Sequence, residues 1–136
     1  MMHAPAVVIH GLADAEAALA PARPVLLLSA PGAVLGPGCL WWRELVAAAR
    51  ARHPETPCTD VLDCADAAGL AMGALRAGQR TLRLDAACPG FAAVAAAAAV
   101  LGAEVLAERP AALDLAAPGA LRRLADWLGD RASMLR

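Results

Sequence analysis

The chain has 136 residues, a formal net charge of −1 and a hydrophobic content of 60%. This length corresponds to one ordinary domain that can bury a single core, and the near-zero charge excludes a general electrostatic attraction to nucleic acid. The sequence contains no Lys and no Tyr, which excludes a Schiff-base lysine, a Walker-type phosphate lysine and a phenolic acid or base. The excess of Ala and Arg is typical of a GC-rich bacterial genome.

Strand-like and helix-like runs alternate along the chain. The strands are expected at 6–10, 25–28, 59–62, 81–84 and 104–107, and the helices at 12–20, 41–53, 65–77, 89–101 and 119–134. The alternation predicts a single α/β domain over residues 1–136, built as a three-layer sandwich. Its five-stranded, mainly parallel sheet is expected in flavodoxin-like, doubly wound order (2-1-3-4-5), followed by an amphipathic C-terminal helix at about 119–134.

Some segments also fit other structures. The segment 77–85 (AGQRTLRLD) fits the cadence of a (β/α)₈ barrel, but a complete barrel needs about 250 residues, so a half-barrel that dimerises is the alternative. Residues 110–117 are expected to be irregular, with an extra antiparallel or edge strand near 113–115 as the alternative. Residues 86–103 carry no charge over a length near that of a membrane span, but their many Ala residues favour a helix packed on the sheet. Gly69 and Gly73 are expected to let the helix at 65–77 approach the sheet closely.

Polar residues follow the strands at the points where the strands end. Ligands of open parallel sheets bind in the crevice outside the carboxyl ends of the strands, so the candidate site is expected at this edge. The pattern places there His10, Ser29, Asp63, Cys64, Asp66, Asp85, Cys88, Glu108 and Arg109.

Cys88 is the most specific candidate for a nucleophile or a redox centre. It precedes Pro89, which suits the first turn of a helix, and unpaired N–H groups at a helix start lower the pKa of a thiol. Asp85 would oppose this effect if it lies close. The structural alternative is a small buried cysteine.

Carboxylates and one histidine provide the expected acid and base groups. Asp63 and Asp66 lie in one loop after the third strand, where two carboxylates can take different pKa values and act as acid and base. Asp63 and Asp85 end neighbouring strands and could form a pair, and His10 ends the first strand. Asp63 or Asp66 could instead cap the following helix.

The loop 29–38 (SAPGAVLGPG) is the candidate for binding an anion. Ser29 and the backbone N–H groups of Gly32, Gly36 and Gly38 are expected to contact a small anionic ligand, together with Asp66 and Arg109. The spacing is not GxGxxG, so no dinucleotide site is predicted.

Trp41 and Trp42 open the second helix. Adjacent helical residues point about 100° apart, so one of the two is expected to pack inward, and burial of both at opposite flanks of the helix is the alternative. The spacing of Trp41, Leu45, Ala48 and Ala49 places these four residues on one face. The other ring would cover the crevice or form a subunit contact.

The four cysteines show no CxxC spacing, and the N-terminus has no basic region before its apolar run. Reduced thiols in a cytoplasmic protein are therefore expected, without a metal, another cofactor or a membrane partner. The leading hypothesis is a non-catalytic or regulatory domain, expected as a homodimer, that binds a small anionic molecule or a protein partner at the carboxyl edge. The alternatives are a small cysteine-dependent enzyme or redox protein that uses Cys88, and a pure protein-interaction module.

Overall fold

The computed structural model describes residues 3–134 of the chain. These residues form two compact units. Unit 1 comprises the residues up to Leu28, Leu45–Thr59 and the residues from Pro110 onward, and unit 2 comprises Ser29–Glu44 and Asp60–Arg109. The chain therefore passes between the units several times.

Six strands occur in the described residues, and every pairing given for them is parallel. They follow one another in the order β5-β4-β3-β2-β1-β6. Their bounds are β1 Ala6–Val8, β2 Val25–Leu28, β3 Cys58–Asp63, β4 Thr81–Arg83, β5 Glu104–Leu106 and β6 Ala112–Asp114.

Helices connect most of these strands. Their bounds are α1 Leu12–Leu19, the short 3₁₀ helix η1 Ala33–Leu35, α2 Cys39–Arg52, α3 Ala68–Arg76, α4 Phe91–Leu101 and α5 Ala120–Met134. The predicted α/β class, with a parallel sheet flanked by helices, is confirmed.

Two details of the sheet differ from the sequence-based expectation. The sheet has six strands rather than five, because Ala112–Asp114 pairs in parallel with β1 inside a segment expected to be irregular. The neighbours of β1 are consequently β2 and β6, whereas the order 2-1-3-4-5 places β1 between the second and third strands. The three-residue strand β6 lacks β-branched residues, so its sequence carries little strand propensity.

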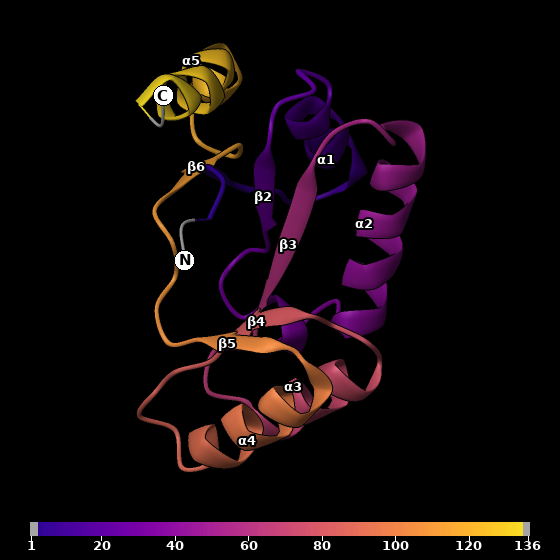
Figure 1. The fold of residues 1–136 in the computed structure, drawn as a ribbon, viewed down its shortest axis with the longest axis vertical. Coiled ribbons are helices and arrows are strands. Elements are labelled where there is room, and N and C mark those ends of the chain that lie inside the picture. Colours follow the sequence, from indigo (N-terminus) through magenta and orange to yellow (C-terminus); the bar gives the residue numbers. More distant parts are fainter. Residues whose placement is uncertain (1–2, 135–136) are drawn as a thin grey trace. The chain divides into compact units, whose positions relative to one another are not determined.

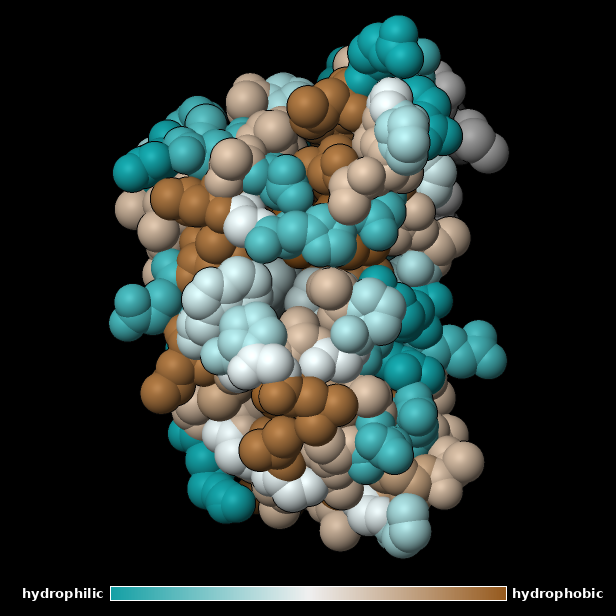
Figure 2. Space-filling view, turned by 180° about the vertical axis from the view of Figure 1, so that it is seen from behind, coloured by the Kyte–Doolittle hydropathy of each residue, from teal (hydrophilic) through white to brown (hydrophobic). Residues whose placement is uncertain are grey.

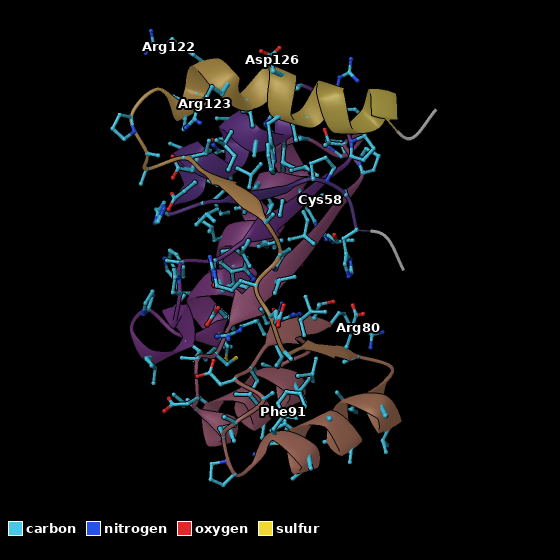
Figure 3. The ribbon with its side chains drawn as sticks, turned by 90° about the vertical axis from the view of Figure 1, so that its left-hand side faces the viewer. Cys58, Arg80, Phe91, Arg122, Arg123 and Asp126 are labelled. Carbon is cyan, nitrogen blue, oxygen red and sulfur yellow. The ribbon has the colours of Figure 1, made fainter. Side chains whose placement is uncertain are left out.

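In unit 1, β1 lies between two parallel neighbours and is buried along its whole length. Helix α5 packs beside β6 (Figure 1), with Leu124 and Leu128 buried. The indole Nε1–H of Trp127 donates a 2.8 Å hydrogen bond to the carbonyl oxygen of Ala6. Arg122 and Asp126 project from the side of α5 that faces away from β6 (Figure 3), as the amphipathic spacing predicts.

In unit 2, helices α3 and α4 lie side by side (Figure 1). The closest approach involves Gly90, immediately before α4. A Cβ atom at Gly90 would lie 2.5 Å from the Cβ of Ala68, which is closer than such atoms pack. By contrast, a Cβ at Gly69 or Gly73 would meet no heavy atom within 4 Å, so the expectation that these two glycines allow close packing is wrong.

The start of α2 also belongs to unit 2, and it buries Trp42 rather than Trp41. The Nε1–H of Trp42 donates a 2.8 Å hydrogen bond to Asp60 Oδ2, which also accepts one from the side-chain amide of Gln79. The buried residues of α2 are Trp42, Leu45, Val46 and Ala49, which stand at i, i+3, i+4 and i+7 on one face of the helix. The expected face of Trp41, Leu45, Ala48 and Ala49 is therefore corrected, because Trp41 and Ala48 are exposed.

The surface of the molecule carries separate apolar areas among hydrophilic ones on the face shown in Figure 2. The uncharged segment 86–103 contributes only the 11-residue helix α4. Within the described residues, no helix has both the length and the apolar character needed to cross a membrane.

Candidate functional site

The polar residues at the carboxyl ends of β3, β4 and β5 in unit 2 form one cluster. Asp63 is the last residue of β3 and stands in register with Arg83, the last residue of β4. Arg109 follows β5 by three residues, and Ser29 follows β2 directly. The strand-end pattern therefore brings Ser29, Asp63 and Arg109 together as predicted, and it adds Arg83.

Asp63 is the centre of this cluster, and its side chain is almost completely buried. Its Oδ1 accepts hydrogen bonds from the backbone N–H groups of Gly32 (3.0 Å) and Ala65 (2.8 Å). Its Oδ2 lies 2.8 Å from Nη1 of Arg109 and 3.7 Å from Nη1 of Arg83. Burial of a carboxylate is costly unless it is paired and hydrogen-bonded, and both conditions are met here.

The two arginines have different amounts of internal bonding. Arg83 Nε donates to the carbonyl oxygen of Ala107, and its Nη1 lies 2.6 Å from Oδ1 of Asp85. Arg109 uses Nη1 alone, which donates to Asp63 Oδ2 and to the carbonyl oxygen of Ser29. Within the described part of the chain, Nε and Nη2 of Arg109 have no hydrogen-bond acceptor.

Ser29 supports the cluster from below the surface. Its hydroxyl oxygen accepts a 2.9 Å hydrogen bond from the backbone N–H of Asp63, and the hydroxyl donates to the carbonyl oxygen of Ala30. The residue is fully buried. Ser29 therefore positions Asp63 and the start of the loop, and its hydroxyl is already used internally.

The three loop glycines are also engaged within unit 2. The N–H of Gly32 points to Asp63, and the N–H groups of Gly36 and Gly38 both donate to the carbonyl oxygen of Ala33. Gly32 has φ of 67°, a left-handed conformation that favours glycine. The carboxylate of Asp63 thus occupies the donor that a bound anion was expected to use.

Asp85 lies beside this cluster, and Asp66 follows Asp63 by three residues along the chain. Asp66 is exposed, and the N-cap residue of α3 is Ala67, which makes no side-chain capping bond. Helix capping by Asp63 or Asp66 is therefore not observed. Asp85 is about two-fifths exposed and pairs with Arg83, so Asp63 and Asp85 contact the same arginine from two sides.

Cys88 is buried in the turn between β4 and α4. Helix α4 begins at Phe91 with Gly90 as its N-cap, so Pro89 lies outside the helix, contrary to the prediction. The carbonyl oxygen of Cys88 accepts a hydrogen bond from the N–H of Phe91, and its own N–H donates to the carbonyl oxygen of Asp85. The thiol therefore precedes the helix by a turn instead of standing at its first N–H groups.

Cys64 follows Asp63 and is completely buried. Burial, followed by the effects of Asp63 and Cys39, raises the pKa of its thiol from 9.0 to about 12. The thiol therefore stays protonated at neutral pH, and the thiolate that a nucleophile needs is not formed there.

His10 has its partners in unit 1. Its Nε2 lies 2.7 Å from Oδ1 of Asp114, and its backbone N–H donates to Oδ2 of Asp14. Oδ1 of Asp114 also accepts a hydrogen bond from the N–H of Ala116. Asp63, Asp85 and Cys88, with which His10 was grouped from the sequence, belong to unit 2.

Sequence reasoning missed two of these polar residues. Arg83 lies within β4, and its position opposite Asp63 depends on the register of two strands. Asp114 ends β6, the edge strand that the sequence offered only as an alternative near 113–115. Arg83 could have been found from the sequence because it lies two residues before Asp85, close to the end of the fourth predicted strand.

The described residues contain no group of three or more His, Cys, Asp or Glu side chains that could hold a metal ion. In comparisons with known proteins, no protein-family model matches the chain, and no curated protein matches it significantly.

Proposed function

We propose that the protein is a non-catalytic or regulatory domain that binds a small anion at the carboxyl ends of β3, β4 and β5. Arg109 is the principal contact, and Arg83 supports it. The observation that carries the proposal is the bonding of Arg109, which is anchored through Nη1 while Nε and Nη2 have no acceptor within the described residues.

Anchoring of this kind favours anion recognition. Nε and Nη2 form one edge of the planar guanidinium and match the two oxygens of a carboxylate or phosphate. Because Asp63 and the carbonyl oxygen of Ser29 already fix the group, less side-chain freedom is lost when a ligand binds. The Arg109 side chain is about one-quarter exposed, so it is open to a ligand from solvent.

The charge balance of the cluster makes Arg109 the better contact of the two arginines. Two arginines face two carboxylates, so the cluster is formally neutral before a ligand binds. The closest contact of Arg83 is with the partly exposed Asp85, whose negative charge would repel an anion on that side. Arg109 lies against the buried Asp63, whose oxygens are already saturated with donors.

Titration of the purified protein with inorganic phosphate, acetate and malonate, followed by calorimetry and amide chemical shifts, tests the proposal. The informative variant is Arg109→Lys, which keeps the positive charge beside Asp63 but loses the bidentate edge. We expect it to weaken binding at least about tenfold, which corresponds to roughly 1.4 kcal/mol.

Arg76→Lys is the matched control, because Arg76 is exposed in the last turn of α3 and should not alter binding. The proposal fails if none of the three anions binds the folded wild-type protein at concentrations of about 10 mM. It also fails if Arg109→Lys and Arg76→Lys bind the probes equally well.

A further inference from the structure

Three large apolar side chains are exposed on the segment that leaves the arginine cluster. Leu35 is 58% exposed, Leu40 is 68% exposed and Trp41 is 37% exposed. All three belong to unit 2, in the uncharged segment 29–42 that begins at Ser29. We refer to Leu35, Leu40 and Trp41 as the apolar rim.

The loop that carries Leu35 is held at Asp63. The N–H of Gly32 donates to Asp63, and a Cβ at Gly32 would lie 3.6 Å from Cδ1 of Leu35. The carbonyl oxygen of Ala33 accepts the N–H groups of Gly36 and Gly38, which folds the loop back on itself.

The start of α2 is held in the same way. The carbonyl oxygen of Gly38 accepts the first helical hydrogen bond, from the N–H of Trp42. The Nε1–H of Trp42, the residue after Trp41, donates a 2.8 Å hydrogen bond to Asp60 in β3, the strand that ends at Asp63. Leu40 and Trp41 therefore emerge from a helix start that is fixed beside the strand end carrying the cluster.

This arrangement combines a fixed cation with exposed hydrocarbon. Arg109 supplies the charge, because the segment with the apolar rim has none. A purely polar anion would use Arg109 and leave the three apolar side chains in water. A ligand with both an anionic end and a hydrocarbon part would cover both surfaces, and the gain grows with the apolar area removed from water.

We infer that the ligand is a small free carboxylate with a hydrocarbon chain, an inference that rests on the proposed function. Its carboxylate binds the Nε and Nη2 edge of Arg109, and its chain packs on Leu35, Leu40 and Trp41. The inference commits to a monomeric small molecule, so that binding does not require a lipid bilayer.

The test uses the series acetate, butyrate, hexanoate and octanoate, each below its micelle concentration. Binding is followed by calorimetry and by the fluorescence of Trp41, whose ring lies 6.3 Å from that of Trp42. Complete burial of a methylene group strengthens binding about fourfold, so partial cover on an exposed rim should give about twofold per methylene. Arg109→Lys should lower the affinity for every chain length by a similar factor.

The variant Leu40→Ser should reduce the dependence on chain length while leaving acetate binding unchanged. Leu121→Ser is its matched control, because Leu121 is an exposed leucine on α5 in unit 1. Thermal unfolding of each variant confirms that it is folded before its affinity is compared.

The outcomes separate this inference from the proposed function. If acetate and octanoate bind equally well, the hydrocarbon chain of the ligand makes no contact with the apolar rim. The inference is then wrong, although the proposed anion site stands. If no carboxylate or phosphate binds, both are wrong. If octanoate binds but Arg109→Lys has no effect, or if only anionic lipid vesicles bind, the inference is also overturned.

Discussion

Replacement of Asp63 by Asn provides the sharpest test of how the polar cluster is held together. The amide has nearly the same shape, so its oxygen can still accept the N–H groups of Gly32 and Ala65. The position of Oδ2 would carry an NH₂ group, which faces the donor Nη1 of Arg109 at 2.8 Å and cannot bond to it. The substitution therefore removes a charge without creating a large cavity.

The expected loss of stability follows from these contacts. A hydrogen bond to a charged group contributes about 1.5–3 kcal/mol, and the two remaining bonds to Oδ1 weaken because a neutral amide oxygen replaces a carboxylate oxygen. Arg109 and Arg83 are partly exposed and regain some hydration, which limits the penalty. We expect Asp63→Asn to lower the free energy of unfolding by about 3 kcal/mol, a large part of the 5–15 kcal/mol typical of a domain.

Urea unfolding followed by tryptophan fluorescence and circular dichroism measures this change. Asp66→Asn is the control, because Asp66 is exposed and makes no cap on α3. It should stay within about 0.5 kcal/mol of the wild type. A free energy of unfolding for Asp63→Asn that also lies within about 0.5 kcal/mol of the wild-type value would refute the reasoning, because the buried carboxylate would then contribute nothing.

Other substitutions test neighbouring features. Burial raises the pKa of Cys64 from 9.0 to about 12 in the folded protein, so its contribution to stability is complete below pH 9 and is lost as the pH rises from 9 toward 12. The free energy of unfolding should fall by about 1.4 kcal/mol per pH unit over this range. Urea titrations between pH 8 and pH 11 should show this slope, and Cys64→Ala should flatten it. Gly90→Ala should destabilise by about 1–3 kcal/mol because its Cβ would lie 2.5 Å from that of Ala68, and Ala68→Gly should restore part of the loss in thermal unfolding. Gly69→Ala, with open space at its Cβ position in α3, should instead stabilise by about 0.5–1 kcal/mol, and a loss there would contradict the packing described for this helix. Ala65 has a positive φ of 50°, so Ala65→Gly should raise the melting temperature by relieving about 1 kcal/mol of strain, and an unchanged or lower value would show that no strain is stored.

The alternation of strands and helices was predictable because each apolar run ends at a polar residue or a turn residue. The same strand-end reasoning correctly brought Asp63, Ser29 and Arg109 to one edge of unit 2. It depends only on local sequence and on the parallel arrangement of the strands. Features set by longer-range geometry were less accessible.

The errors have specific causes. Strand β6 has three residues and pairs with a strand near the other end of the sequence, so no local pattern marks it. The choice between Trp41 and Trp42 depended on which apolar residues of α2 share the buried face, and the structure buries Val46 rather than Ala48 there. The loop glycines were expected to present free N–H groups, but Asp63 occupies one of them, and sequence alone does not show that a carboxylate of the chain itself fills an anion position.

The pairing of β1 with β6 has a consequence for the newly made chain. Ala6 pairs with Ala112, 106 residues later (112 − 6), whereas unit 2 is complete at Arg109. During synthesis, unit 2 can therefore form its contacts while one edge of the apolar strand β1 still has open backbone N–H and C=O groups. Such an edge can pair with a neighbouring nascent chain. Conditions that slow translation before residue 112 should thus favour aggregation of this protein.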